Sequence, residues 1–250
     1  MTDIQDLPSH NRLKGRRIVV TGAASGMGEG ISRFFVHEGA RVTLLDINPN
    51  VLTIAEELGQ TGIVTDVSSE TSVNAAITQA AKAMDGIDGV INSAGILQHT
   101  TLEDTDFATF QKIVGVNLAG PFLICKAALP HLRAAPRATI VNISSLAGLH
   151  GYPTMSVYAA TKGALIRFTE SLMGEVGPTI RVNCICPGII RTAMTEYMFQ
   201  SNQPFEPENR IQVGRVGTPL DIAQTALFLT SDESAFISGE ALPVSGGRLG

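Results

Sequence analysis

Tyr158 and Lys162 are the residues whose types and spacing most directly indicate catalytic chemistry. They lie four positions apart in the stretch YAATK, at the start of an expected helix, so their side chains share one face, with Cβ atoms about 6 Å apart. A phenol with a pKa of about 10 is a poor base at neutral pH, but a neighbouring ammonium favours the phenolate and lowers that pKa. The pair therefore indicates general acid–base chemistry. An amphipathic helix with an exposed Tyr and Lys is the alternative, and it would be preferred if the pair stood alone.

Polar and turn residues at the ends of expected strands strengthen the catalytic interpretation. Ser144 and Ser145 end one such strand, and Pro187 and Gly188 follow the next. The carboxyl ends of the strands of an open parallel sheet face its ligand crevice. We therefore expect these segments to lie beside the Tyr–Lys pair.

A glycine-rich turn, TGAASGMG, joins the first expected strand to a helix at residues 21–28. Such a turn places backbone N–H groups and the positive end of a helix where a pyrophosphate can bind, and a side chain would keep the backbone away from the phosphates. No Lys-Ser/Thr pair follows the last glycine, so this is not a P-loop. The spacing also differs from the common G-x-G-x-x-G, and a plain tight connection is the alternative.

An acidic residue supports the dinucleotide interpretation. Asp46 ends the second expected strand, 18 residues after Gly28. Its carboxylate can accept hydrogen bonds from both adenosine-ribose hydroxyls and would repel a 2′-phosphate. Neither Ser25 nor Ile47 offers a compensating positive charge, so the sequence favours NAD over NADP. A strand-end turn residue is the alternative for Asp46, and Asp66 either holds the adenine amino group or caps the next helix.

The elements that must position these residues alternate along the chain. Strands are expected at 16–21, 41–46, 62–65, 89–92, 138–144, 179–185 and 240–244, and helices at 27–38, 51–58, 70–84, 105–134, 155–175 and 219–230. The strands are continuous hydrophobic runs, which indicates burial on both faces of a parallel sheet. The sequence thus predicts an α/β fold, a Rossmann-type doubly wound sheet of about seven strands with helices on both faces.

We expect one catalytic domain over residues 15–250, because no linker, charge block or repeat divides the chain. Residues 1–14 are expected to form a loose polar extension. The stretch 192–214 lacks clear periodicity, and its apolar Met194, Tyr197, Met198, Phe199 and Phe205 favour a lid over a substrate. A flexible surface loop is the alternative.

Composition excludes several classes of protein. The chain has 250 residues, of which 44% are hydrophobic, and its net charge of -5 argues against disorder and against nucleic-acid binding. Cys125, Cys184 and Cys186 are too few for a disulfide framework, and no metal site is expected; reduced core thiols are the simplest interpretation. We find no signal peptide and no apolar run near the roughly 20 residues that span a bilayer, and therefore expect a cytoplasmic protein.

Taken together, the motifs resemble the short-chain dehydrogenase/reductase family over nearly the whole chain. The matching pieces are TGAASGMG (21–28), Asp46, Asp66-Val67, NSAG (92–95), Asn117, ISS (143–145), YAATK (158–162), RVN (181–183), PGIIRT (187–192) and SGGR (245–248). Their order and spacing make the resemblance specific. One departure is Ser93, where the family usually has a second Asn, which affects the bracing of the strand more than the chemistry.

The resemblance implies four catalytic residues. Tyr158 would be the general acid/base, and Lys162 would hold the nicotinamide ribose hydroxyls and depress the tyrosine pKa. Ser145, rather than Ser144, would hydrogen-bond the reacting oxygen, since it lies 13 residues before Tyr158. Asn117 would anchor a water that relays protons from Lys162 to solvent.

The resemblance also implies a set of cofactor residues for NAD. Asn92, Ala94 and Gly95 would line the cofactor floor, and Ile190 and Thr192 would hold the carboxamide. The full set is Gly22, Ser25, Gly26, Met27, Gly28, Asp46, Ile47, Asp66, Val67, Asn92, Ala94, Gly95, Tyr158, Lys162, Pro187, Gly188, Ile190 and Thr192.

We therefore expect reversible hydride transfer between NAD and a secondary alcohol or ketone. A non-catalytic NAD-binding sensor and a nucleotide-sugar epimerase or dehydratase are the alternatives. The expected substrate-binding residues are Ser145, Leu97, His150, Tyr152, Tyr158 and Met194, with His99, Leu146, Met155, Tyr197 and Met198 nearby. The resemblance further implies a homotetramer.

Overall fold

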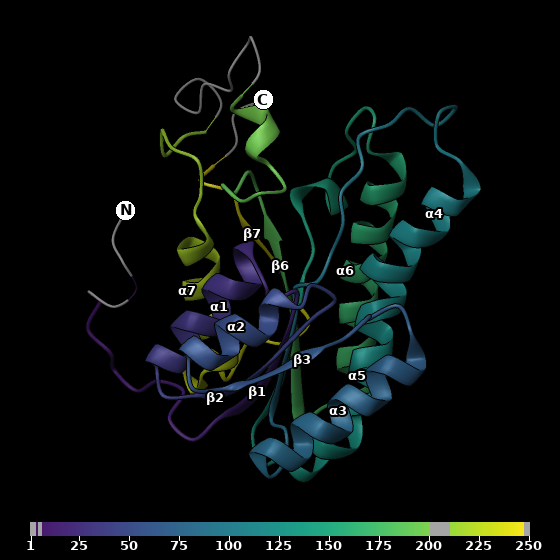
Figure 1. The fold of residues 1–250 in the computed structure, drawn as a ribbon. Helices are drawn as coiled ribbons and strands as arrows, with labels where there is room; N and C mark the ends of the chain where they lie inside the picture. The colour runs from purple at the N-terminus through teal and green to yellow at the C-terminus, as the bar shows by residue number, and fades with distance from the viewer. Residues whose placement is uncertain (1–3, 5–6, 201–210, 248–250) are drawn as a thin grey trace.

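Seven parallel strands form one sheet in the computed structural model, which describes residue 4 and residues 7–200 and 211–247 (Figure 1). The strands are β1 (Arg17–Thr21), β2 (Arg41–Asp46), β3 (Thr61–Val64), β4 (Gly89–Asn92), β5 (Ala138–Ile143), β6 (Ile180–Pro187) and β7 (Ala241–Val244). Their spatial order is β3-β2-β1-β4-β5-β6-β7, and every neighbouring pair is parallel. This confirms the predicted doubly wound sheet.

Helices cover both faces of the sheet. On one face lie α1 (Gly26–His37), α2 (Asn50–Glu57) and α7 (Pro219–Thr230). On the other face lie α3 (Glu70–Met84), α4 (Phe107–Val114), α5 (Gly120–Ala134) and α6 (Ser156–Val176). A π-helical segment, η2 (Gly115–Ala119), joins α4 to α5. Three short 3-10 turns are η3 (Leu146–Gly148), η4 (Glu196–Met198) and η6 (Asp232–Ser234).

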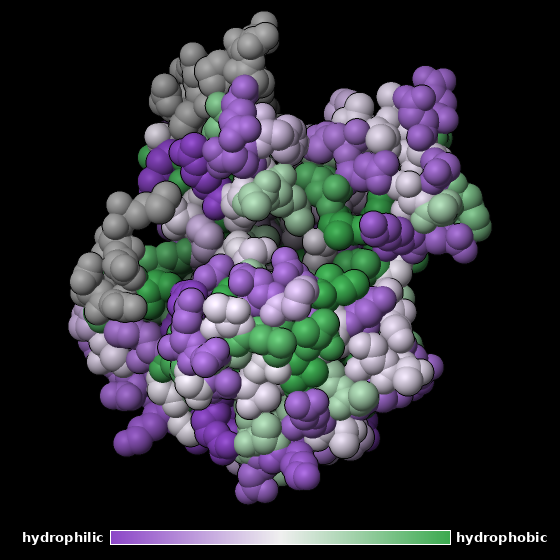
Figure 2. All heavy atoms as spheres, in the orientation of Figure 1, coloured by the Kyte–Doolittle hydropathy of each residue, from purple (hydrophilic) through white to green (hydrophobic). Residues whose placement is uncertain are grey.

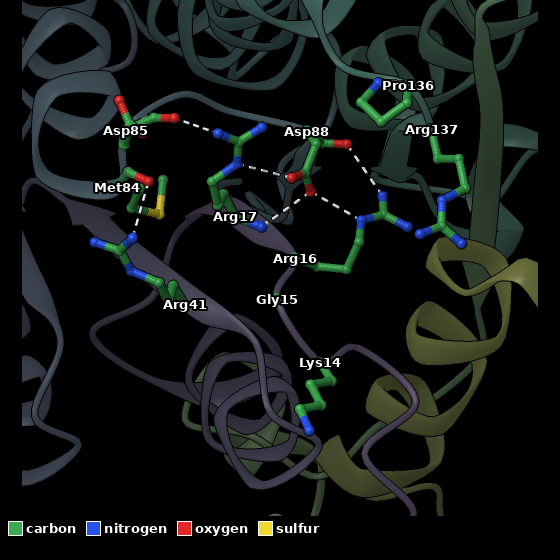
Figure 3. A pocket seen from close by; sticks show the side chains of 10 residues that line it. All are labelled: Lys14, Gly15, Arg16, Arg17, Arg41, Met84, Asp85, Asp88, Pro136 and Arg137. Carbon is green, nitrogen blue, oxygen red and sulfur yellow. Dashed lines mark hydrogen bonds and ion pairs between the residues drawn. The ribbon is translucent and has the colours of Figure 1, made fainter.

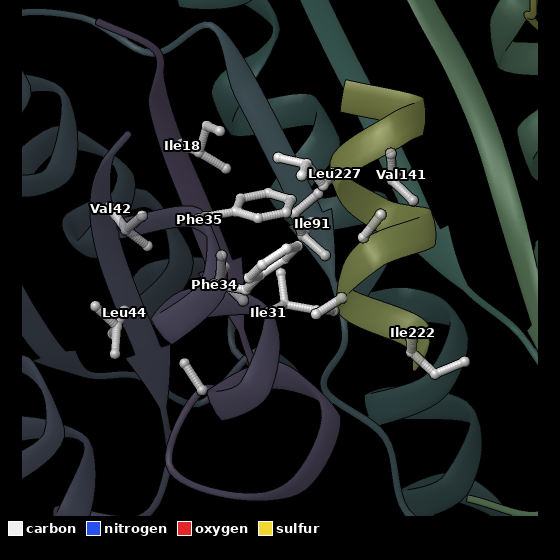
Figure 4. Close-up of a cluster of buried hydrophobic side chains, with 14 of the residues drawn as sticks. Ile18, Ile31, Phe34, Phe35, Val42, Leu44, Ile91, Val141, Ile222 and Leu227 are labelled. Carbon is white, nitrogen blue, oxygen red and sulfur yellow. The ribbon is translucent and has the colours of Figure 1, made fainter. Parts of the chain in front are cut away.

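The core has two halves because alternate residues of each strand point to opposite faces. On β1, Ile18 and Val20 pack toward α1 and α7, whereas Val19 packs toward the other helix layer. Phe34 and Phe35 of α1 fill the space between β1, β2 and α7 (Figure 4). Every residue of β4 and β5 is buried, which accounts for their continuous apolar sequences.

The order of the strands reverses between β1 and β4. The chain moves outward from β1 through β2 to β3, then returns to place β4 on the other side of β1. The two crossovers leave in opposite directions and open a crevice at the carboxyl ends of these strands. The glycine turn follows β1 at this point.

The N-terminal segment differs from the expectation of a loose extension. Leu13 is fully buried, and its backbone N–H donates to the carbonyl of Glu38. Leu7 packs against the core, and Arg12 forms an ion pair with Glu233. Single apolar residues among polar ones anchor this segment. They are too few to form the helical or strand periodicity from which the sequence would have predicted their burial.

The helical run Phe107–Ala134 also differs from expectation. By length and composition it could cross a membrane, since an 18-residue window has a mean hydropathy of 1.6, and 39% of that window is buried inside the protein. Its inner side packs on β4, β5 and α3, so Ile124, Cys125 and Leu132 belong to the core. A core helix passes the same test as a membrane span, and Ile124, Cys125 and Leu132 here are buried in the core.

Only part of the expected lid lies within the described residues. Residues 192–200 are described and include the turn η4, and Ile211–Gly214 lie against the chain end through hydrogen bonds to Gly246 and Gly247. Phe205 lies outside the described residues.

Candidate active site

The glycine turn brings β1, β4 and the start of α1 into close contact. Gly22 has a φ of +68°, and a Cβ there would lie 2.7 Å from the backbone N of Ala94. A Cβ on Gly28 would lie 2.1 Å from the carbonyl oxygen of Gly22. The side chain of Ser25, the N-cap of α1, makes no capping hydrogen bond. The first backbone N–H groups of α1 therefore remain available to bind an anion such as a pyrophosphate.

Asp46 and Asp66 sit beside this turn at the ends of β2 and β3. One carboxylate oxygen of Asp46 accepts a hydrogen bond of 3.0 Å from the N–H of Ala24, and the other accepts one of 2.8 Å from the N–H of Asn48. Asp66 accepts hydrogen bonds from the backbone and hydroxyl of Ser68. Both acids brace their own turns and also face the adjoining cavity. The alternative of Asp66 as a helix cap is wrong, because Ser69 is the N-cap of α3 and accepts from the N–H of Ser72.

A cavity of about 410 Å³ lies at the crevice. Figure 2 shows a hollow on this face with hydrophobic residues along its rim. Twelve of the expected cofactor residues line the cavity: Gly22, Ser25, Gly26, Met27, Gly28, Asp46, Ile47, Asp66, Val67, Ala94, Gly95 and Thr192. Met194, expected to bind substrate, lines it too.

Tyr158, Ser145 and Lys162 meet at the carboxyl end of β5. Ser145 lies near enough to Tyr158 to lower the pKa of its phenol, and Lys162 Nζ lies 5.8 Å from the centre of the Tyr158 ring. The ammonium donates a hydrogen bond of 2.9 Å to the carbonyl of Ile143. Ser144 is turned away, because its buried hydroxyl donates to the carbonyl of Lys162. Of the two adjacent serines, Ser145 therefore reaches the tyrosine.

The pKa values of this group differ from the sequence-based expectation. Burial raises the pKa of Tyr158, and the hydrogen bond from Ser145 lowers it in part. Burial also lowers the pKa of Lys162 to about 8, against the opposing effect of Cys184 and Cys186. In the chain alone, desolvation of the phenol thus outweighs the opposing effect of Ser145 on the pKa. The phenolate depends on additional positive charge at this place.

Asn117 is held in η2, where a π-helical turn turns its side chain toward the chain after β4. Its Oδ1 accepts from the N–H of Ile96 at 2.9 Å, and its Nδ2 donates to the carbonyl of Ile96 and to the hydroxyl of Thr161. A Cβ on Gly95 would lie 3.3 Å from Lys162 Nζ and 3.4 Å from Asn117 Oδ1. Gly95 therefore leaves room for Asn117 and Lys162 to lie on either side of it.

Comparison with known proteins identifies this arrangement. The family model described as Enoyl-(Acyl carrier protein) reductase matches residues 22–248. The chain is 37% identical to the 2-(S)-hydroxypropyl-CoM dehydrogenase 3 of Xanthobacter autotrophicus over 249 residues, which cover 95% of this chain and 98% of that protein. The chain belongs to the short-chain dehydrogenase/reductase family.

Solved structures of similar proteins share the fold. A Brucella melitensis short-chain dehydrogenase/reductase described as glucose/ribitol dehydrogenase superposes with a TM-score of 0.90 at 34% identity and covers 94% of this chain and 96% of that one. The 3-ketoacyl-(acyl-carrier-protein) reductase of the same organism, complexed with NADH, has a TM-score of 0.88 at 31% identity, covering 94% and 99%. As a short-chain dehydrogenase/reductase, the chain is an oxidoreductase that binds a nicotinamide cofactor.

Several family-implied residues lie beside the cavity rather than in its wall. Asn92 is buried, with its amide on Asn142 and Cys125. Gly188 ties the end of β6 to β7, since its N–H donates to Val244. Tyr158, Lys162, Pro187 and Ile190 are likewise not among the residues that line the cavity. The expected substrate residues Leu97, His150 and Tyr152 do not line it either, and His150 is exposed.

The structure adds lining residues that the motifs did not indicate. They are Thr65, Ser93, Ile96, Lys112, Val116 and Ala193. Lys112 and Val116 come from the helical run 107–134, one turn apart, and only its packing beside β4 turns them to the cavity. A helical spacing between Lys112, Val116 and Asn117 could have indicated that face.

A second cavity, of about 340 Å³, lies at the opposite end of the sheet (Figure 3). The arginines that line this cavity form ion pairs and hydrogen bonds with other residues of the protein. Asp88 pairs with Arg16 at 2.8 Å and with Arg17 at 3.0 Å, and Arg41 donates to the last carbonyls of α3. Arg137 pairs with Asp232. These contacts brace the amino ends of the strands.

Proposed function

We propose that the protein is an NAD-dependent oxidoreductase that transfers a hydride reversibly between the nicotinamide and a secondary alcohol or its ketone. The observation that carries the proposal is the grouping of Tyr158 with Ser145 and the ammonium of Lys162, beside the cavity that the glycine turn, Asp46 and Asp66 line. A sensor protein would need only the cavity. The group of three side chains favours catalysis.

Each residue of the group has a separate task. In the oxidation direction Tyr158, as the phenolate, removes the hydroxyl proton while Ser145 hydrogen-bonds the same oxygen. Lys162 would hold the ribose hydroxyls, and Asn117 fixes the chain after β4 through two hydrogen bonds with the backbone of Ile96. The bound nicotinamide supplies the acceptor of the hydride and a positive ring that favours the phenolate.

The preference for NAD rests on the charges of the cavity. Asp46 and Asp66 face it from β2 and β3, whereas Lys112 is its one lining cation within the described residues and comes from α4. Ile47, next to Asp46, is 67% exposed and offers no charge to a 2′-phosphate. A phosphate beside Asp46 would face a carboxylate already fixed by two backbone N–H groups.

The substrate that fits this group is a compact, partly hydrophobic alcohol or ketone. Met194 and Ala193 bring apolar surface to the cavity, and Ile96 lies on its other side. The relative from Xanthobacter autotrophicus is named as a dehydrogenase of 2-(S)-hydroxypropyl-CoM, in which the 2-hydroxypropyl group is a secondary alcohol.

The catalytic proposal is tested by following NADH absorbance with a panel of secondary alcohols and ketones. We expect Tyr158→Phe to lower kcat by about 10²–10⁴-fold, the usual contribution of a positioned acid/base, while NADH still binds. Turnover by the Phe variant at the wild-type rate would remove Tyr158 from the mechanism.

The cofactor proposal is tested separately by comparing NAD with NADP. Wild type should favour NAD, and Asp46→Ser should narrow the difference by lifting the repulsion of the 2′-phosphate. Equal kcat/KM values for the two cofactors in wild type would contradict the argument from charge.

We also propose that the protein is a homo-oligomer, as the family resemblance implies for a tetramer. Phe107 and Phe110 stack on one another at 69% and 41% exposure, and Phe122 is 47% exposed farther along the same helical run. Apolar surface of this kind is typical of an interface. Light scattering of wild type and Phe107→Ser measures the oligomeric state, and a monomeric wild type would overturn the proposal.

A further inference from the structure

His99 connects three loops at the carboxyl ends of β4, β5 and β6. It lies in the chain after β4, and its ring contacts one residue before α6 and one in the segment after β6. Nε2 lies 2.7 Å from the hydroxyl of Tyr197, and Nδ1 lies 3.2 Å from the hydroxyl of Thr154. The rings of His99 and Tyr197 also meet edge to face, with centroids 5.6 Å apart.

Thr154 is held in a conformation that needs outside support. Its φ is +64°, in the left-handed region, which is unfavourable for a β-branched residue and persists where surrounding contacts fix it. The N–H of Thr100 donates a 3.0 Å hydrogen bond to the carbonyl of Thr154, and His99 binds its hydroxyl. The chain after β4 thus fixes the loop before α6 through two neighbouring residues.

Tyr197 belongs to a segment whose two ends are tied together. Arg191 Nε lies 3.5 Å from the carboxylate of Glu196, and its guanidinium lies 4.7 Å from the centre of the Phe199 ring. The hydroxyl of Thr195 donates to the carbonyl of Ile190 at 2.6 Å. A shift of Tyr197 would therefore move residues 190–199 together.

The same segment forms one wall of the cavity. Thr192, Ala193 and Met194 line it, and Tyr197 follows three residues after Met194 and is 49% exposed. The hydrogen bond and ring contact to His99 join Tyr197 to the chain after β4, where residues 93–96 line another part of the cavity.

We propose that His99 and Tyr197 form a clasp that holds residues 192–194 against the cavity and so positions the substrate for the proposed reaction. Both are positioning residues, because they act through the wall. This inference deepens the proposed function and rests on it for its kinetic consequence, but the clasp itself is a property of the free protein.

The charge states of the two residues suit this contact. Burial lowers the pKa of His99 and raises that of Tyr197, so both are neutral at pH 7. A neutral imidazole has one donor and one acceptor nitrogen, which serve one hydroxyl each.

The clasp is tested first without turnover, by trypsin cleavage after Arg191 in the full-length protein. His99→Ala and Tyr197→Phe should each be cleaved about 2–10-fold faster than wild type, as expected for the loss of one hydrogen bond. The double variant should be cleaved no faster than the quicker single variant. His10→Ala, an exposed histidine of the N-terminal segment, is the matched control and should behave as wild type.

Wild-type cleavage rates in either clasp variant, or effects that multiply in the double variant, would overturn the proposal. The second measurement is the steady-state rate with a substrate found in the alcohol panel. The single variants should raise KM by about 2–10-fold and change kcat by less than about twofold, and an unchanged KM would also overturn it. Faster cleavage combined with no turnover of any alcohol by wild type would leave the clasp in place and reject the proposed function.

Discussion

The ammonium of Lys162 lies 5.8 Å from the centre of the Tyr158 ring, one turn along the same face of α6. Lys162 is 5% exposed and donates to the carbonyl of Ile143 at the end of β5. Tyr158 lies nearer the mouth and is half-buried. The lysine is therefore a buried cation held beside the phenol, and its burial has a measurable cost.

We expect Lys162 to make the stability of the protein depend on pH above 7. Its pKa is about 8 in the folded chain against 10.5 ordinarily, so the unfolded chain binds more protons between these values. The penalty for burying the charge is fully present below pH 8 and is lost as the pH rises through 8 toward 10.5. Relative to Lys162→Met, wild type should gain ~2 kcal/mol in unfolding free energy between pH 7 and pH 10.

Urea unfolding of both proteins at pH 7, 8, 9 and 10 measures this difference. The comparison cancels the titration of other groups, since the two chains differ at one residue. A difference in stability that is independent of pH would mean that Lys162 keeps an ordinary pKa when buried.

Gly28→Ala should weaken NADH binding. The new Cβ would lie 2.1 Å from the carbonyl of Gly22, so the helix start must separate from the turn that faces the phosphates. We expect the NADH dissociation constant, measured by fluorescence titration, to rise by more than about tenfold, the equivalent of 1.4 kcal/mol.

Gly174→Ala is the matched control for this substitution. Gly174 also lies in a helix, α6, but no heavy atom lies within 4 Å of its new Cβ. Alanine there should stabilise the protein by ~0.5–1 kcal/mol and leave NADH binding unchanged. Normal affinity in Gly28→Ala would show that the turn can yield to a methyl group.

Asp88→Ala should destabilise the protein strongly without changing NADH affinity. The carboxylate is 6% exposed and binds Arg16, Arg17 and the backbone N–H of Arg17. Its removal leaves two guanidiniums without their anion, which costs ~3–5 kcal/mol when the pair is buried.

Asp232→Ala removes the exposed pair with Arg137 at the same end of the sheet, where both side chains are more than 60% exposed. Thermal unfolding should place this variant within ~1 kcal/mol of wild type. Equal losses from the two substitutions would contradict the role assigned to burial.

The sequence predicted most of the fold because its signals are local. The strand runs, the glycine turn and the helix periods each depend on residues close together in the chain, and α3 and α7 match their expected bounds. The attachment of Leu13 was missed, because a single buried leucine in a polar segment has no period. The clasp between His99 and Tyr197 was missed as well, since 98 residues separate the two.

The sequence by itself determined the element order, the α/β class and the residue types of the site, since these follow from periodicity and spacing along the chain. Tertiary structure alone decided that Lys112 faces the cavity and that His99 meets Tyr197. It also decided that burial raises the pKa of Tyr158, whereas the sequence predicted that the neighbouring Lys162 would lower it. The direction in which a side chain points and the extent of its desolvation depend on the residues that pack around it. Those residues come from segments far apart in the sequence.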